Sequence, residues 1–90
     1  MNTTWDPNKA QANFRKHGVR FSDAEAVLFD PHAITREDPT TAAERRFVSV
    51  GLDVLGRVVV VVYTYRRDDV RLISARLATP NERRHYEKGI

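Results

Sequence analysis

Residues 46–77, RFVSVGLDVLGRVVVVVYTYRRDDVRLISARL, decide the fold of this chain. Residues 46–52 have a period of two, in which Arg46, Val48, Val50 and Leu52 alternate with Phe47, Ser49 and Gly51, as a half-buried strand requires. The five consecutive valines at 58–62 are β-branched and apolar on both faces, which predicts the central strand of a sheet. Residues 70–77 predict a third strand. Because only short turns join the three segments, the sequence predicts an antiparallel meander.

The third strand contains two arginines, and their spacing predicts which face of the sheet each one occupies. Arg71 and Arg76 are five positions apart, which is odd in a period of two, so we expect them on opposite faces of the sheet. Arg76 also follows an apolar run, where an arginine needs a carboxylate, a ligand or an exposed groove. Glu82 or Glu44 could supply the carboxylate. Only part of the positive charge is therefore expected to face one ligand.

Helix signals flank this sheet on both sides. Asp6 as N-cap and Pro7 at the first helical position predict a helix over residues 7–17 that Gly18 ends. A capping-box pattern that begins at Ser22 predicts a second helix ending by residue 29, followed by a possible strand at 33–37 and a loop at 39–41. A second capping box with proline predicts a C-terminal helix over residues 80–88. We therefore expect an α+β fold with two N-terminal helices packed on a small antiparallel meander and a short C-terminal helix.

Composition limits the classes of function. Ninety residues form a single domain, 1–90, and the lack of cysteine excludes disulfides and thiolate metal sites. No signal peptide or membrane span is predicted, so we expect a cytoplasmic protein. Residues 1–43 carry five Lys/Arg against six Asp/Glu, whereas residues 44–90 carry ten against six. Twelve of the fifteen cations are arginine, whose planar fork of donors suits phosphate, and this favours a polyanion such as RNA as ligand.

Few catalytic chemistries fit the residues. No glycine-flanked serine or glycine-rich phosphate loop is present, and Glu82 with His85 is too weak a pair to indicate a metal site, so no metal and no cofactor are expected. What remains is attack of an RNA 2′-hydroxyl on its own phosphate, which needs a base, an acid and cations. The chain offers candidates for proton transfer and charge stabilisation in Arg76, Tyr86, Glu82, Lys16 and His17, and candidates for RNA binding in Arg57, Arg66, Tyr63 and Arg83.

Each candidate also has an ordinary structural interpretation. Lys16 and His17 could simply interact with the last carbonyls of the first helix. Tyr63 and Tyr65 could be the polar ends of a buried strand instead of stacking platforms for bases. The residue pattern alone leaves these alternatives open.

The order and spacing of several blocks resemble the BrnT toxin family over nearly the whole chain. They include Trp5-Asp6-Pro7, Lys16-His17-Gly18-Val19, Asp30-Pro31, Gly56-Arg57, Val61-Val62-Tyr63-Thr64, Ser74-Ala75-Arg76, Glu82 and Tyr86. The resemblance implies a RelE-like fold and a metal-independent ribonuclease that inhibits translation. It also implies a BrnA-like ribbon-helix-helix antitoxin in a 2:2 heterotetramer, with operator DNA contacted only through the antitoxin. Arg76 and Tyr86 are the site residues that the resemblance carries over best.

Two other functions are compatible with the sequence. The chain could be a non-catalytic module that binds RNA or an antitoxin, such as a decayed toxin. A domain that binds DNA directly is less well supported, because no helix-turn-helix with base-reading polar residues is predicted. We also expect the antitoxin to cover the basic sheet surface and exposed strand edges that a substrate would use.

Overall fold

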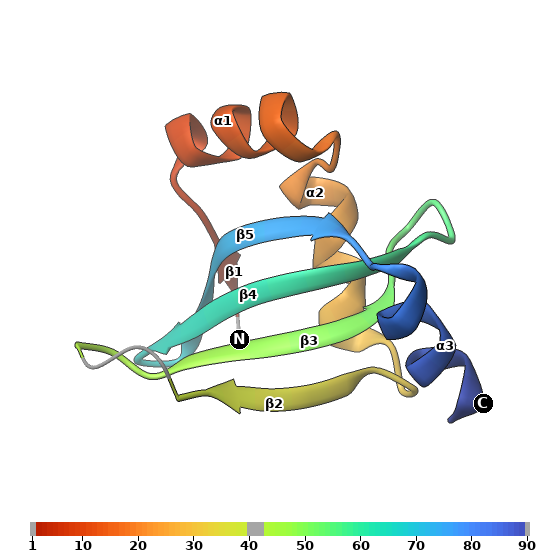
Figure 1. Cartoon of the computed structure of the whole chain (residues 1–90). Coiled ribbons are helices and arrows are strands. Elements are labelled where there is room, and N and C mark those ends of the chain that lie inside the picture. Colours follow the sequence, from red (N-terminus) through yellow and green to blue (C-terminus); the bar gives the residue numbers. More distant parts are fainter. Residues whose placement is uncertain (1, 40–42, 90) are drawn as a thin grey trace.

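The computed structural model of the chain describes residues 2–39 and 43–89 (Figure 1). Its elements follow the order β1 (Thr3–Thr4), α1 (Pro7–His17), α2 (Phe21–Ala24), the 3-10 helix η1 (Glu25–Phe29), β2 (Ile34–Asp38), β3 (Arg46–Leu52), β4 (Val58–Arg66), β5 (Asp69–Leu77) and α3 (Pro80–Lys88). The α+β class is confirmed. Thr40 and Thr41, part of the predicted loop, lie outside the described residues.

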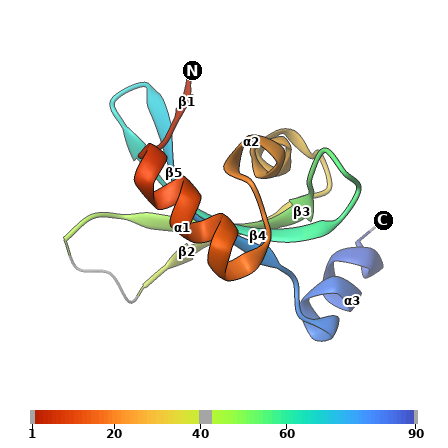
Figure 2. The ribbon, with the colours of Figure 1, turned by 90° about the horizontal axis from the view of Figure 1, so that it is seen from above.

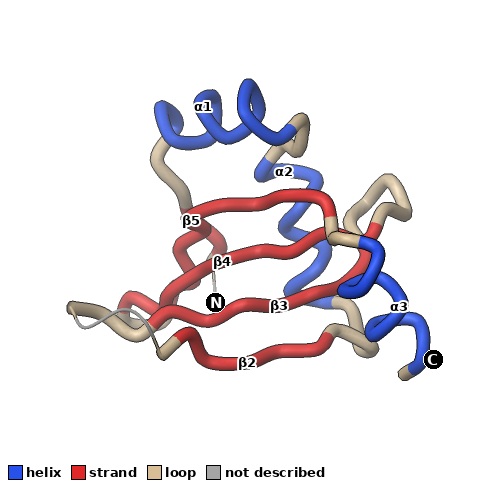
Figure 3. Tube along the Cα trace, in the orientation of Figure 1, coloured by secondary structure: helices blue, strands red, loops and turns tan. Residues whose placement is uncertain are grey.

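One five-stranded sheet organises the molecule, with strand order β1-β5-β4-β3-β2 (Figure 3). β2 pairs with β3, β3 with β4 and β4 with β5, all antiparallel, and β1 pairs with β5 in parallel. The predicted meander and the central position of the valine-rich strand are confirmed. The sheet is wider than predicted because the short segment before α1 joins one edge and β2 joins the other.

Helices cover the two faces of the sheet unequally. Seen from above, the segment of α2 and η1 lies on one side of the sheet and α3 on the other (Figure 2). The main core forms under α1, α2 and η1, where Phe21 and Val27 pack on Val59, Val61 and other residues of β4 and β5. A smaller cluster on the opposite face contains Val48, Val60 and Ala78. We call this second face of β2–β5 the open face, because α3 is the only helix among the described residues that crosses it, at one end.

Capping explains where α1 and α3 begin. The Asp6 carboxylate accepts a hydrogen bond from Asn8 N, and Gly18 ends α1 with φ 70° in the left-handed region that favours glycine. The Thr79 hydroxyl and the Glu82 side chain form the predicted capping box of α3. Both predicted helices are confirmed with their bounds.

The second helix differs from its prediction. Its α-helical part is the single turn of α2, which begins at Phe21 with Arg20 as an N-cap that makes no side-chain hydrogen bond. The capping box predicted at Ser22 is therefore wrong, and η1 continues the chain as a 3-10 helix. Burial of Phe21 and Ala24 against the sheet decides where this helix begins, which a local capping pattern does not encode.

Asn13 fastens α1 to the edge of β5. Its side chain is buried and donates to the carbonyl oxygens of Val19 (3.0 Å) and Ala75 (2.8 Å), and its amide oxygen accepts from Ala75 N (3.0 Å). β1 pairs only with Val70 and Arg71, so Asn13 satisfies the backbone of β5 further along the same edge.

Candidate functional site

A bulge in β5 determines which side chains reach the open face. Val62 pairs with Ser74 and Tyr63 with Leu72, so β5 carries one extra residue between these pairs. Arg71 then lies opposite Thr64, and Arg76 opposite Val60, four positions apart on β4. Both arginines therefore share the open face, and the prediction that they face opposite sides is wrong. An inserted residue reverses the parity that a regular strand would have.

Five arginines belong to the open face by strand register. They are Arg36, Arg46, Arg66, Arg71 and Arg76. Arg46 forms an ion pair with Glu44 at 3.5 Å. The side chains of Arg36, Arg66 and Arg71 make no hydrogen bond or ion pair with another residue in the described part of the chain. The face thus combines a valine floor with guanidinium groups that remain available to an anion.

Arg76 is held by Glu82, from the first turn of α3. Arg76 Nη1 donates to Glu82 Oε1 at 2.8 Å and Nη2 to Oε2 at 3.0 Å, a bidentate pair. Hydrogen bonding to Arg76 lowers the pKa of Glu82 to about 2, against the opposing effect of burial. The guanidinium of Arg76 is oriented by this contact, and its side chain remains 41% exposed. Glu82 is consequently an anion that orients Arg76, and it is itself a weak base.

A cleft of about 410 Å³ adjoins Glu82 between α3 and the strands β2 and β3. It is lined by Ile34, Arg36, Val48, Val50, Asn81, Glu82 and His85. Arg36 and His85 are exposed and contribute a cation and an imidazole to opposite walls, one from β2 and one from α3. Imidazole is the side chain that exchanges protons most readily near neutral pH. The cleft therefore combines anion-binding and proton-transfer groups.

Tyr86 and Tyr63 are both buried, which leaves little of either side chain for a substrate to contact. Tyr86 is 1% exposed, and its hydroxyl donates to Asp30 Oδ2 at 2.5 Å. Burial and the hydrogen bond to Asp30 raise the pKa of Tyr86 to about 12. Tyr63 is buried in the main core, with its hydroxyl 2.8 Å from Ser49 Oγ. Tyr86 anchors α3, and Tyr63 has no free ring face for base stacking.

Arg57 belongs to the β3–β4 hairpin and not to the open face. Its guanidinium pairs with the fully buried carboxylate of Asp53 at 2.8 Å and lies 3.4 Å from the carbonyl oxygen of Gly18. Arg57 thus ties the hairpin to the end of α1, near Lys16 and His17. Arg66 ends the same strand that Arg57 precedes, so about 30 Å of extended chain separates them. These two arginines cannot bind the same phosphate.

The remaining predicted residues lie near Arg57, at the end of α1 and on α3. Arg83 and Arg57 line a cleft of about 480 Å³ together with Leu77 and Tyr86. Lys16 and His17 end α1, and no hydrogen bond or ion pair between described residues joins them to the Arg76–Glu82 pair. Their roles in proton transfer stay predictions.

The structure adds residues that were not among the predicted site. Arg36, Arg46 and Arg71 belong to the open face or its cleft. Period-two counting along residues 34–38 could have suggested Arg36, but the position of Arg71 depends on the bulge, for which the sequence carries no turn or glycine signal.

Within residues 2–39 and 43–89, no helix has the length and apolar character needed to cross a bilayer.

Comparison with known proteins identifies relatives of this chain. The family described as "Ribonuclease toxin, BrnT, of type II toxin-antitoxin system" matches residues 5–82. A comparison with curated proteins found no match. Among solved structures, the crystal structure of the Brucella abortus ribonuclease toxin BrnT is similar, with a TM-score of 0.64 and 28% sequence identity. The match covers 88% of this chain and 99% of that chain. The sequence resemblance is thus confirmed, and the chain belongs to the BrnT family of type II toxin-antitoxin ribonuclease toxins.

Proposed function

We propose that this chain is an endoribonuclease toxin that binds and cleaves RNA on the open face. The observation that carries the proposal is that five arginines lie on one sheet face, where the β5 bulge adds Arg71 to the other four. Phosphates along a single strand can contact successive guanidinium groups, while the partly buried Val50, Val58 and Val62 can contact sugars and bases. The family to which the chain belongs supports the same activity.

The cleft beside Glu82 provides groups for phosphodiester cleavage. In the proposed reaction the RNA 2′-oxygen loses its proton and bonds to the adjacent phosphorus, the bond from phosphorus to the 5′-oxygen breaks, and that oxygen gains a proton. Arg76 and Arg36 stabilise the charge that builds up on the phosphate. His85 is the proposed proton-transfer group, and Glu82 orients Arg76. Because guanidinium groups supply the positive charge, the reaction is proposed to need no metal.

The partners proposed for the chain follow from its family. We expect a BrnA-like ribbon-helix-helix antitoxin, a 2:2 heterotetramer and contact with operator DNA through the antitoxin only. We also expect a cytoplasmic location, a RelE-like fold and inhibition of translation as the result of cleavage. The first check on this set is whether a short reading frame beside the gene encodes such an antitoxin.

Substitution of Arg76 tests the activity directly. Arg76→Ala and Arg76→Lys should lower cleavage of a labelled RNA by about 100-fold or more, because alanine removes the cation and lysine cannot form the bidentate pair with Glu82 that orients it. Arg45→Ala is the control, since the exposed Arg45 side chain contacts Glu37 and the ring of Phe47 and does not contact the Arg76–Glu82 pair. Circular dichroism melts would confirm that each variant folds. Normal cleavage by folded Arg76→Ala would remove Arg76 from the site.

Three further substitutions separate the candidate proton-transfer groups. His85→Ala should lower cleavage, whereas Tyr86→Phe should reduce the melting temperature and leave cleavage by the folded protein intact. The double variant Lys16→Ala/His17→Ala tests the residues at the end of α1. If that variant alone loses activity, proton transfer takes place near Arg57 and the end of α1 and not in the cleft beside Glu82.

A binding module without catalysis is the alternative. The low pKa of Glu82 favours it, because a carboxylate with a pKa of about 2 accepts protons poorly. Under this alternative the chain free of antitoxin would bind RNA with the open face and leave it intact, both naked and on ribosomes. Cleavage in either assay would exclude it.

A further inference from the structure

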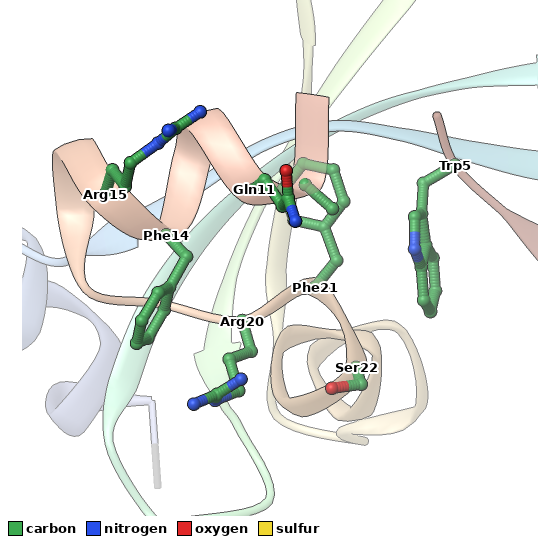
Figure 4. A pocket seen from close by; sticks show the side chains of 8 residues that line it. Trp5, Gln11, Phe14, Arg15, Arg20, Phe21 and Ser22 are labelled. Carbon is green, nitrogen blue, oxygen red and sulfur yellow. The ribbon is translucent and has the colours of Figure 1, made fainter. Parts of the chain in front are cut away.

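An apolar groove lies between α1 and α2, away from the open face (Figure 4). It has a volume of about 420 Å³ and is lined by Trp5, Ala10, Gln11, Phe14, Arg15, Arg20, Phe21 and Ser22. Trp5 packs edge to face on Phe21, with ring centroids 6.0 Å apart. Phe14 is 40% exposed. Figure 4 shows Phe14 and Trp5 at the two ends of the groove, with Gln11 and Phe21 between them.

The charge of the groove is one-sided. Its lining contains two guanidinium groups, Arg15 and Arg20, and no carboxylate. Neither guanidinium forms a hydrogen bond or ion pair with another residue in the described ranges, and the same holds for the side-chain polar groups of Gln11 and Ser22. Apolar lining, unpaired cations and free amide and hydroxyl groups together match a ligand that is both apolar and acidic.

Ring geometry distinguishes a peptide from a nucleic acid as the occupant. The Arg20 guanidinium lies 4.3 Å from the centroid of the Phe14 ring and so already covers one face of it. Phe21 is buried, and its ring contacts Trp5. The aromatic rings are thus engaged with one another and with arginine, whereas binding of single-stranded RNA relies on free ring faces. An aliphatic side chain flanked by carboxylates fits the groove better.

We propose that this groove binds an acidic segment of the antitoxin that inserts an aliphatic side chain between Phe14 and Trp5. The inference rests on the proposed function, which supplies the antitoxin. Carboxylates of the segment pair with Arg15 and Arg20, and its backbone bonds to Gln11 and Ser22. The groove borders the helices that cover the main core, so this contact lies on a side that RNA on the open face does not use, in contrast to the sequence-based expectation that the antitoxin covers the basic sheet surface.

Trp5 provides a specific reporter, because it is the single tryptophan of the chain. The toxin is labelled with 5-fluorotryptophan, and its one fluorine resonance is followed while unlabelled antitoxin, encoded beside the toxin gene, is added. A single-stranded RNA oligonucleotide is titrated in a parallel experiment. The proposal predicts a shift with antitoxin and none with RNA. A shift with RNA alone, or antitoxin binding without a shift, would overturn it.

Charge reversal tests the two arginines of the groove. The double variant Arg15→Glu/Arg20→Glu should bind antitoxin at least about tenfold more weakly, with the loss largest at low salt, while cleavage of RNA remains normal. Lys9→Glu is the matched control, because Lys9 is exposed on the same helix and does not line the groove. Equal affinities of the control and the double variant would contradict the proposal.

The outcomes also separate this inference from the proposed function. If antitoxin binds but the Trp5 resonance and the groove variants are unaffected, the groove assignment fails and the toxin assignment stands. If the wild-type chain neither cleaves RNA nor binds any antitoxin, the proposed function fails and the groove assignment fails with it.

Discussion

Asn13 shows how one polar side chain can replace part of a strand. Its amide group makes three hydrogen bonds with backbone atoms of Val19 and Ala75 in a buried position. A strand edge that enters the core needs such partners, because unpaired backbone groups are costly to bury. Only the structure shows this role of Asn13.

We predict that Asn13→Ala lowers the free energy of unfolding by about 2–4 kcal/mol, because it leaves buried backbone groups unpaired. Asn8→Ala, on the exposed side of the same helix, should change it by less than about 0.5 kcal/mol. Urea unfolding of the two variants measures both values. Similar stabilities for the two would mean that water replaces the Asn13 contacts.

The ion pair between Arg76 and Glu82 makes stability depend on pH in a defined window. The pKa of Glu82 falls from an ordinary value of 4.5 to about 2 in the folded chain. A lowered pKa stabilises the folded state above the ordinary pKa, and this contribution is lost as the pH falls from 4.5 towards 2.

We therefore predict that Glu82→Gln is less stable than the wild type by about 1 kcal/mol at pH 7, a value reduced by the partial exposure of the pair. Glutamine can still complete the capping box, so the substitution isolates the charge. Urea unfolding at several pH values should show the difference shrinking below pH 4.5. A constant difference down to pH 2 would contradict the assigned pKa.

At the scale of the element, the bulge in β5 governs the composition of the open face. Without the extra residue, Arg71 and Arg76 would lie on opposite faces, as counting along a regular strand predicts. Two predicted helices kept their bounds because capping residues act within a few positions. The start of α2 was not predicted, because it depends on contacts with the distant sheet.

The shared face of Arg71 and Arg76 has a measurable consequence for RNA binding. Arg71→Ala and Arg36→Ala should each weaken binding of single-stranded RNA and lower the slope of log affinity against log salt by about 0.7, the value for one lost phosphate contact. Lys9→Ala, on α1, removes a charge away from the open face and should leave the slope unchanged. Fluorescence anisotropy at several salt concentrations measures the slopes. Equal slopes for Arg71→Ala and the wild type would remove Arg71 from the interface.

In the molecule as a whole, the two proposed binding sites lie on different sides of the sheet, one for RNA and one for an antitoxin segment. The open face carries guanidinium groups beside valines, and the helix-covered side carries the apolar groove between α1 and α2. The C-terminal helix is anchored within the chain by the hydrogen bond from Tyr86 to Asp30. Its position in turn places Glu82 beside Arg76 and His85 beside the cleft.

We predict that cleavage of RNA by the purified chain is unchanged in EDTA, because the proposed reaction uses guanidinium groups to balance the charge on the phosphate. The products should end in a 2′,3′-cyclic phosphate and a 5′-hydroxyl. Gel analysis of an end-labelled RNA, with and without EDTA, measures both. Activity that EDTA abolishes and magnesium restores would show that a metal takes part.

The sequence by itself determined the α+β class, the order of the strands from β3 to β5, the bounds of α1 and α3, and the family. These features follow from periodicity and capping, which act over a few residues, and from the order of motifs along the chain. The tertiary structure decided which arginines share a face, which tyrosines are buried and where α2 begins. These depend on a strand bulge and on contacts between residues far apart in the chain, which no local pattern encodes.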